Sequence, residues 1–273
     1  MAKSDQDYLE ILLRSVNESV IDGVRMPDFP HDELQLYTVG SSNEKALRAG
    51  FRFYKAVKGY CKLFNRPLQP DSRILDFGCG WGRITRFFFN NVKGENVVGV
   101  DVQQDLVKFC RKRMHHGKYY VINPLPPAKL PKNSFDLIFA HSVLSHLEEG
   151  VAMEWIKEFA RLLKPGGMVV ITTWGKTFLD RCEALRNQAQ GVTHNIWARA
   201  FVHVEKAKED YDQGKFLFEP GPREGGPLDK AFFGLALIPR QYVEKEYTKH
   251  LKLLDFVDEK VKDPQAMFVM QKV

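Results

Sequence analysis

The chain has 273 residues, of which 44% are hydrophobic and 12% aromatic, enough to bury a full core in one large domain. Its formal charge is +6 and its isoelectric point about 9.0, a mild excess that permits an anionic partner without requiring one. The densest basic cluster is RKRMHHGK, residues 111–118, which is more typical of a solvated helix end than of a nucleic-acid arm. The polar start, the lack of a long apolar run and the four scattered cysteines predict a cytoplasmic protein with reduced thiols and no membrane span.

Two helices are expected in residues 1–68, which we group as an N-terminal helical cap. Apolar side chains recur every four residues near the start: Tyr8, Leu12, Val16 and Val20. This spacing predicts a helix over residues 5–22, which the segment PDFPHDEL then breaks. The second helix is expected over residues 42–64, with Ser42 as its N-cap.

From Arg73 to Trp174 short apolar runs alternate with helical patterns. Strands are expected at RILDF, NVVGVD, KYYVI, SFDLIFA and MVVITTW, and helices at GRITRFFFNNV, QQDLVKFCRKRM and GVAMEWIKEFARLL, with a turn at KPGG. Such alternation implies crossover units and a buried parallel sheet. The closing runs LKLLDFVD and AMFVMQKV are close enough to pair as an antiparallel hairpin. We therefore predict an α/β fold over residues 69–273, with a doubly wound sheet of seven strands, six parallel and the last antiparallel.

The alternation lapses over residues 176–235, which we interpret as an inserted segment. Helices are expected there at RCEALRNQAQ and ARAFVHVEKAKEDYDQ, and a loop at FEPGPREGGPLDK. A further helix, PRQYVEKEYTKH, leads into the closing hairpin.

The most informative stretch is RILDFGCGWGRITRFF, residues 73–88. A glycine-rich turn between a strand and a helix lets the backbone approach a ligand and aims amide N–H groups at it. The dinucleotide fingerprint G-x-G-x-x-G is not met, and the Gly-Lys-Ser/Thr of a P-loop is absent. Instead, Asp76 precedes glycines at alternate positions: Gly78, Gly80 and Gly82.

This D-x-G-x-G-x-G pattern resembles the first motif of the class I S-adenosylmethionine-dependent methyltransferases. Asp101, at the end of the second strand, matches the acid with which this family holds a ribose. LPKNSFDLIFAHSVLSHL resembles the family's fourth-strand segment, and ARLLKPGGMVVITTW its fifth. The resemblance covers about residues 70–175 and the C-terminal hairpin, and it implies a Rossmann-like fold.

The resemblance also implies S-adenosyl-L-methionine as cofactor and assigns roles to matching residues. The methionine part would lie against the turn at Gly78, Cys79 and Gly80. Asp76 would help to orient the amino group of the methionine part, and Asp101 would bind the ribose. Cys79 is interpreted as a small apolar filler rather than a nucleophile.

The remaining cofactor contacts would come from the loops that follow later strands. Val102 would pack on the adenine, and Asn123 or Pro124 would border the base. His141 would face the methionine part or the acceptor. Trp81, unusually large for this turn, is interpreted as a lid packed on neighbouring side chains.

Methyl transfer to a hydroxyl usually needs a base, whereas a neutral amine does not. The catalytic candidates are His141 and His146 in AHSVLSHL, because histidine has a suitable pKa and ligands bind at this edge of a parallel sheet. Either could instead cap or pack. His194 and His203 are weaker candidates, and no recognised metal motif occurs, so we expect no metal.

We predict a methyltransferase that acts on a small-molecule acceptor, most simply at oxygen; a sugar, a glycolipid precursor or a specialised metabolite would fit. The N-terminal helices and residues 176–235 are expected to cover the acceptor, with aromatic side chains in the insert: Trp197, Phe201, Tyr211, Phe216 and Phe218. An N-methyltransferase, a nucleic-acid methyltransferase and a non-catalytic cofactor-binding regulator are the alternatives. Nucleic acid is disfavoured because no appended basic domain is evident.

Overall fold

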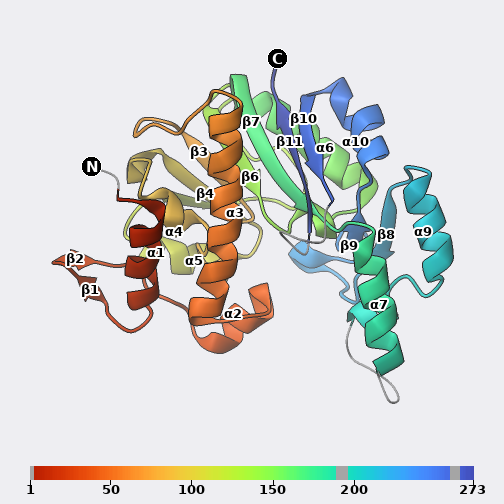
Figure 1. Cartoon of the computed structure of the whole chain (residues 1–273), viewed down its shortest axis with the longest axis horizontal. Coiled ribbons are helices and arrows are strands. Elements are labelled where there is room, and N and C mark those ends of the chain that lie inside the picture. Colours follow the sequence, from red (N-terminus) through yellow and green to blue (C-terminus); the bar gives the residue numbers. More distant parts are fainter. Residues whose placement is uncertain (1–2, 189–195, 259–264) are drawn as a thin grey trace. The chain divides into compact units, whose positions relative to one another are not determined.

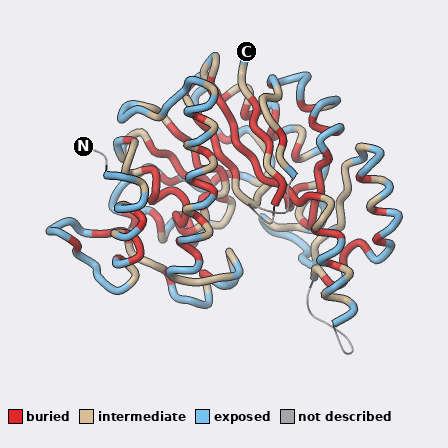
Figure 2. The backbone as a smooth tube through the Cα atoms, in the orientation of Figure 1, coloured by how far each residue is buried: buried red, intermediate tan, exposed pale blue. Residues whose placement is uncertain are grey.

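The computed structural model describes residues 3–188, 196–258 and 265–273. The chain divides into two compact units, the first comprising Met1–Ile122 with Ser134–Phe139 and the second Asn123–Asn133 with Ala140–Val273. The central strands of the sheet are buried over most of their length and drawn red in Figure 2, as are parts of several helices. No helix among the described residues has both the length and the apolar character needed to cross a membrane.

Seven strands are hydrogen-bonded in the order β10-β11-β7-β6-β3-β4-β5 (Figure 1). Their bounds are β3 (Ile74–Phe77), β4 (Val97–Asp101), β5 (Lys118–Val121), β6 (Phe135–Ala140), β7 (Leu163–Thr173), β10 (Lys252–Val257) and β11 (Ala266–Gln271). β3 pairs in parallel with β4 and with β6, and β4 pairs in parallel with β5. β11 runs antiparallel to both β7 and β10. The predicted seven-stranded, Rossmann-like sheet with an antiparallel last strand is confirmed.

The core of the first unit forms where the 21-residue helix α3 (Asn43–Leu63) covers the strands. Ser42 occupies its N-cap position, as predicted, although the side chain makes no capping hydrogen bond. Phe53 on this helix and Phe88 both pack on Phe139 of β6, with ring centroids 6.2 and 4.5 Å apart. The other elements after residue 30 in this unit are α2 (Asp32–Val39), α4 (Thr85–Phe88), the 3₁₀ turn η1 (Gly94–Asn96) and α5 (Gln104–Arg113).

The prediction of one helix over residues 5–22 is wrong in its second half. Helix α1 spans Asp5–Arg14, and a hairpin of β1 (Val20–Ile21) and β2 (Val24–Arg25) follows it. The two residues of the turn, Asp22 and Gly23, have φ values of 51° and 78°. An Asp-Gly pair with two positive φ angles is the preferred chemistry of a tight hairpin, so the local turn signal outweighs the apolar spacing.

Two further local predictions for the first unit need correction. Helix α2 forms in the stretch expected to be a loop. Helix α4 covers only four residues of GRITRFFFNNV. Several turns in and beside α4 close between residues three apart, as from the Phe87 amide to the Ile84 carbonyl (3.1 Å) and from the Asn91 amide to the Phe88 carbonyl (3.0 Å), which is tighter than an α-helix.

The second unit contains a small sheet that the sequence does not predict. Strand β8 (Leu217–Pro220) pairs antiparallel with β9 (Gly234–Leu237), within and just after the segment expected to be a Gly/Pro-rich loop. The helices and 3₁₀ turns of this unit are η2 (Leu144–His146), α6 (Glu149–Leu162), α7 (Thr177–Gln188), α8 (Ile196–Arg199), α9 (Val204–Asp212), η3 (Gly226–Leu228), α10 (Arg240–Glu246) and η4 (Tyr247–Lys249).

Two other predictions in this unit fail because distant residues supply hydrogen bonds. KPGG lies inside β7 rather than in a turn, since Gly166 and Gly167 continue the pairing with Lys272. The helix expected over residues 198–213 is divided at Phe201, which has a φ of 50°. There Arg186 donates to the carbonyls at the end of α8, including that of Ala200 at 2.7 Å.

Aromatic side chains predicted to line an acceptor pocket belong in part to the core of the second unit. Phe201 and Tyr211 are buried in a cluster with Trp174 and Phe178. Trp197 packs on the same cluster, with its ring centroid 5.6 Å from each of those two rings. These three insert residues therefore stabilise the unit by packing with one another, which the sequence pattern could not distinguish from lining a pocket.

Candidate functional site

The chain reverses direction directly after β3 through the glycine turn. Gly78, Gly80 and Gly82 have φ values of 77°, 54° and 81°, in a region that residues with side chains rarely adopt. A Cβ on Gly82 would lie 2.7 Å from the sulfur and terminal methyl of Met114, so that buried side chain would have to shift to admit it. A Cβ on Gly80 would meet no atom within 4 Å. The open space at Gly80 fits a ligand lying against the backbone, the arrangement predicted for the methionine part of the cofactor.

Strand β4 holds this turn in place through its last two residues. The amides of Gly78 and Cys79 both donate to the Val100 carbonyl, at 2.8 and 2.9 Å. The Asp101 carboxylate accepts from the Gly80 amide and from the Gln103 amide, each at 2.9 Å. Burial raises the pKa of Asp101, while these backbone hydrogen bonds oppose that rise. Asp101 therefore shapes the turn, a structural role that the sequence reading did not assign to it.

Asp76 lies at the end of β3 with only 2% of its surface exposed. Its carboxylate accepts a hydrogen bond of 2.5 Å from the hydroxyl of Thr85, a residue that the sequence reading missed. Burial, with a smaller contribution from the nearby Asp101 charge, raises the pKa of Asp76 to about 7, although the hydrogen bond from Thr85 opposes the rise. A cationic group bound beside Asp76 would oppose this shift, because it favours the charged carboxylate. This environment suits the predicted contact with an ammonium group.

Trp81 and Cys79 are packing residues of the turn. Trp81 is 1% exposed and packs with Ala46 of α3 and Leu106 of α5. Arg86 lies over its ring, 5.0 Å from the centroid. Cys79 is buried beside Cys110, and the hydrogen bond between the two thiols, together with burial, raises the pKa of Cys79. A high pKa keeps the sulfur protonated and unreactive, in line with the role of an apolar filler.

The remaining cofactor candidates lie on loops that follow other strands. Val102 is partly exposed directly after β4 in the first unit. Asn123 is exposed in the second unit, next to Pro124, whose carbonyl accepts a 2.9 Å hydrogen bond from the indole of Trp155. His141 directly follows β6 and is partly exposed. Their roles toward the cofactor stay predictions.

His146 is held by the unpredicted small sheet. Its Nδ1 lies 2.7 Å from the carbonyl oxygen of Gly234 in β9, and its ring stacks on Phe233 at 5.2 Å. A carbonyl can only accept, so Nδ1 carries the proton and Nε2 keeps its lone pair. Burial lowers the pKa of His146 from its ordinary value of 6.5. At neutral pH the ring is therefore neutral and correctly protonated to act as a base at Nε2.

Side-chain hydrogen bonds fix the loop between β6 and His146. The Ser142 amide donates to Thr172 Oγ1 at 2.7 Å, and that hydroxyl donates to Gln265 Oε1 at 2.5 Å. Gln265 in turn donates from Nε2 to Ser142 Oγ at 2.9 Å. Ser142 has a φ of 58°, which this closed ring of contacts maintains. Sequence reasoning missed Thr172 and Gln265, because no local signal links them to the loop.

The weaker candidates add nothing to this site. His203 occupies the N-cap position of α9, and its side chain makes no capping hydrogen bond. His194 lies outside the described residues. Within residues 3–188, 196–258 and 265–273, no group of three or more His, Cys, Asp or Glu side chains is placed to hold a metal ion.

Residues 75–169 match the family model described as a methyltransferase domain. Phosphoethanolamine N-methyltransferase 1 of Arabidopsis thaliana is 28% identical over 200 residues, 72% of this chain and 38% of its own length. Malonyl acyl-carrier-protein O-methyltransferase of Enterobacter lignolyticus is 28% identical over 139 residues, 51% of this chain and 52% of its own length. The chain thus spans about two fifths of the length of the phosphoethanolamine N-methyltransferases that it matches.

Among solved structures, the PH0226 protein of Pyrococcus horikoshii superposes with a TM-score of 0.58 at 16% identity, covering 87% of this chain and 95% of its own. That likeness concerns the fold alone. The matched domain and the curated relatives are methyltransferases, in agreement with this fold and with the motif on the glycine turn. The family match over residues 75–169, the curated relatives and the motif on the glycine turn together support a class I S-adenosylmethionine-dependent methyltransferase.

Proposed function

We propose that the chain transfers a methyl group from S-adenosyl-L-methionine to an oxygen atom of a small-molecule acceptor, with His146 as the general base. The observation that carries this proposal is the 2.7 Å contact between His146 Nδ1 and the Gly234 carbonyl. It fixes the tautomer in which Nε2 can take a proton. A methyltransferase acting on a neutral amine has less need of such a group.

The glycine turn supplies the proposed donor site. The open space at Gly80 accommodates the methionine part, Asp76 favours its ammonium group, and Asp101 receives the ribose hydroxyls. When bound, the cofactor supplies an electrophilic methyl group on a positively charged sulfur. The protein has to align the acceptor with that methyl group and keep water away.

In the proposed reaction, His146 accepts the proton of the acceptor hydroxyl at Nε2 as the oxygen forms its bond to the methyl carbon. The glycine turn and Asp101 would hold the cofactor, which would supply the methyl group and keep the electron pair of the carbon–sulfur bond as the uncharged thioether of S-adenosylhomocysteine. The imidazolium keeps its Nδ1–H bond to Gly234 and then releases the extra proton to solvent. His141 is the second candidate for this role, since it directly follows β6.

A methyl transfer to nitrogen is the alternative that a specific observation favours. Phosphoethanolamine N-methyltransferase 1 of Arabidopsis thaliana matches 72% of the chain, whereas the malonyl acyl-carrier-protein O-methyltransferase matches 51% at the same identity of 28%. Against this, a neutral histidine with an unengaged Nε2 is better explained by a hydroxyl acceptor.

The test is turnover of the full chain on a panel of sugars, small alcohols, carboxylic acids and primary amines, with products identified by mass spectrometry. We expect O-methylated products, and calorimetry should show binding of S-adenosylhomocysteine. Methylation confined to amines would contradict the oxygen assignment. Absence of any binding of the methyl donor or its product would support a non-catalytic role instead.

A further inference from the structure

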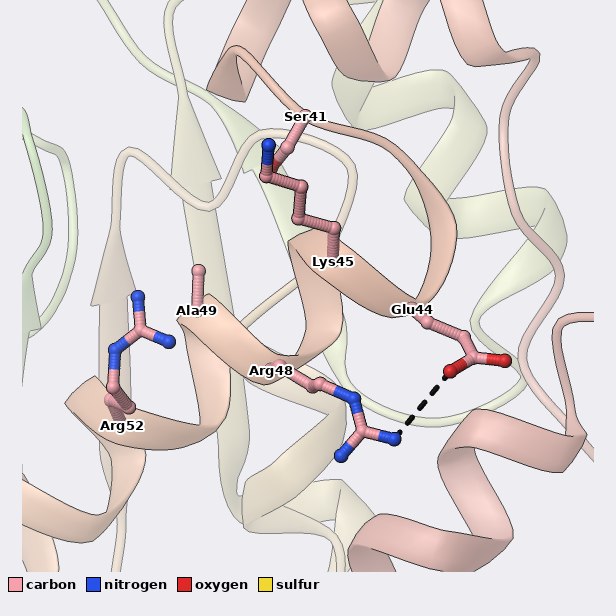
Figure 3. Close-up of a pocket in the computed structure, with 6 residues that line it drawn as sticks. All are labelled: Ser41, Glu44, Lys45, Arg48, Ala49 and Arg52. Atoms are coloured by element: carbon pink, nitrogen blue, oxygen red, sulfur yellow. Dashed lines mark hydrogen bonds and ion pairs between the residues drawn. The ribbon is translucent and has the colours of Figure 1, made fainter.

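A basic stripe runs along one flank of helix α3, where the first unit has a hollow of about 480 Å³. The hollow is lined by Ser41, Glu44, Lys45, Arg48, Ala49 and Arg52 (Figure 3). Figure 3 shows Lys45 and Arg52 extending toward the same side of the helix as Ser41, with Ala49 between them, while Arg48 turns toward Glu44. We call Lys45, Ala49 and Arg52 the α3 flank.

The cations of the α3 flank differ from those further along the same helix. Lys55 and Lys58 both pair with Asp5 of α1, at 3.5 and 2.5 Å, and so fasten two helices together. Lys45 and Arg52 make no ion pair with any other residue that the structure describes. The α3 flank therefore carries positive charge that no ion pair among the described residues balances.

The spacing of the α3 flank suits convergence on one anion. Lys45 and Arg52 are seven residues apart, about 10 Å along the helix axis. Both side chains are long, and Ala49 between them has no side chain beyond its Cβ to fill the space. Ser41 adds a hydroxyl, and the N-terminal end of α3 adds the positive end of the helix dipole. A group with two negative charges placed over Ala49 lies within reach of both cations.

The same segment of α3 supports the glycine turn on its buried face. Ala46 packs with Trp81, and its carbonyl accepts a 3.3 Å hydrogen bond from Arg83. A Cβ on Gly50 would lie 3.3 Å from the Arg83 side chain, so the helix and the turn are in close contact there. The segment of α3 that contacts the glycine turn on its buried face therefore also carries the exposed side chains of Lys45 and Arg52.

From this arrangement we infer that the α3 flank binds the phosphate group of a small-molecule acceptor, through Lys45 and Arg52. The inference rests on the proposed function and names the chemical class of its acceptor. Arginine and lysine are the side chains that bind phosphate oxygens most strongly, and a phosphate dianion matches two cations better than a single carboxylate does. The similarity to phosphoethanolamine N-methyltransferases, whose name gives a phosphorylated amine, is consistent with this inference.

Calorimetry on the full chain saturated with S-adenosylhomocysteine tests the inference. The probes are inorganic phosphate, and glycerol 3-phosphate with glycerol as its uncharged counterpart, at constant ionic strength. We expect the parent to bind the two phosphates and not glycerol. Lys45→Gln and Arg52→Gln should each weaken phosphate binding by about tenfold or more, as loss of a charged hydrogen bond does.

Lys62→Gln is the matched control, because it removes the same charge from an exposed site at the other end of α3. It should leave phosphate affinity unchanged. Equal phosphate affinities in the Lys45, Arg52 and Lys62 variants, or no saturable phosphate binding by the parent, would overturn the inference. Affinity for S-adenosylhomocysteine should be the same in all variants. If the parent fails to bind S-adenosylhomocysteine, the proposed function fails, whereas the phosphate titration still reports on the α3 flank alone.

Discussion

The glycine turn after β3 and the loop after β6 follow two strands that pair in parallel, yet the protein holds them by different means. In the turn, backbone amides bond to Val100 and Asp101, and glycines take up the left-handed conformations. In the loop, Ser142 is held by the side chains of Thr172 and Gln265, the latter 123 residues away.

This difference separates a ligand site that related chains can share from a loop that depends on the side chains of this chain alone. A turn built from backbone groups can hold the same ligand in any chain that keeps the glycines and the acid. A loop built from side chains depends on this chain's own partners, and in the proposed function it carries the base that meets the acceptor. Five predictions test the contrast.

The largest effect is expected from His146→Ala, which removes the proposed base and its lone pair. The turnover rate should fall by roughly 10²–10⁴, whereas affinity for S-adenosylhomocysteine should stay the same. In the parent, the rate should fall on the acid side and level off by neutral pH, because burial holds the pKa of His146 below its ordinary value. A near-parental rate in the variant would favour an amine acceptor or another base.

Gly82→Ala should lower the free energy of unfolding by about 2–4 kcal/mol, since it combines a strained φ with overlap on Met114. Urea denaturation measures this loss. Gly80→Ala is the matched control: its φ is also strained, but its Cβ enters open space. It should cost less stability and weaken cofactor binding more. A larger loss of stability in Gly80→Ala than in Gly82→Ala, with a smaller loss of cofactor affinity, would show that the cofactor does not lie against Gly80.

Asp101→Ala should weaken binding of S-adenosylhomocysteine by about 1.5–3 kcal/mol, through loss of a charged acceptor. The Gly80 amide also loses its partner, so part of the effect should come from a looser turn. Calorimetry gives the affinity, and amide exchange at Gly80 reports on the turn. An unchanged affinity would contradict the ribose assignment.

Gln265→Ala should cost about 1–3 kcal/mol of stability, because Thr172 and Ser142 lose buried hydrogen bonds. Thermal denaturation measures the loss. The loop that carries His146 should shift, so turnover should drop while cofactor affinity does not. A drop in cofactor affinity as large as the drop in turnover would contradict the separation between the two regions.

The smallest effect concerns Asp76, whose pKa is raised to about 7 by burial. A carboxyl group whose pKa is raised by folding destabilises the folded state. This destabilisation grows as the pH rises from 3.8, the pKa of Asp76 in the unfolded chain, through its pKa in the folded protein. The stability gained by Asp76→Asn should therefore grow between pH 6 and 8, by about 1 kcal/mol. Urea titrations at the two pH values measure it, and a constant difference would mean that Asp76 stays ionised throughout.

The same contrast explains what the sequence predicts well and what it does not. The seven strands follow from runs such as NVVGVD, which are apolar throughout because both faces of the sheet are covered. The D-x-G-x-G-x-G turn can be recognised in the sequence because each glycine adopts a positive φ angle, which is a local requirement of the backbone. The contacts of Gln265 and Gly234 depend on residues far away in the sequence, so no pattern nearby announces them.

Errors in the predicted elements have a similar origin. The early end of α1 at Arg14 and the hairpin that follows show that the Asp-Gly turn signal outweighs the apolar spacing on which the prediction rested. The continuation of β7 through KPGG depends on Lys272, which no local reading supplies. Trp197 packs on a core cluster, and an aromatic residue that lines a cavity cannot be told in sequence from one that packs on a core.

The contact between His146 and Gly234 also bears on how such enzymes diverge. The group that orients the imidazole is a main-chain carbonyl, so it does not depend on any side chain of β9. Gly234 itself is constrained, because a Cβ there would overlap the backbone of Glu219 in β8. If His146 is the base and residues 176–235 cover the acceptor, as proposed, then exposed positions in the described part of this segment can change their chemistry while the imidazole keeps its orientation. A lineage, or an engineer, could in that case exchange one acceptor for another by substitution outside the core cluster, without rebuilding the base.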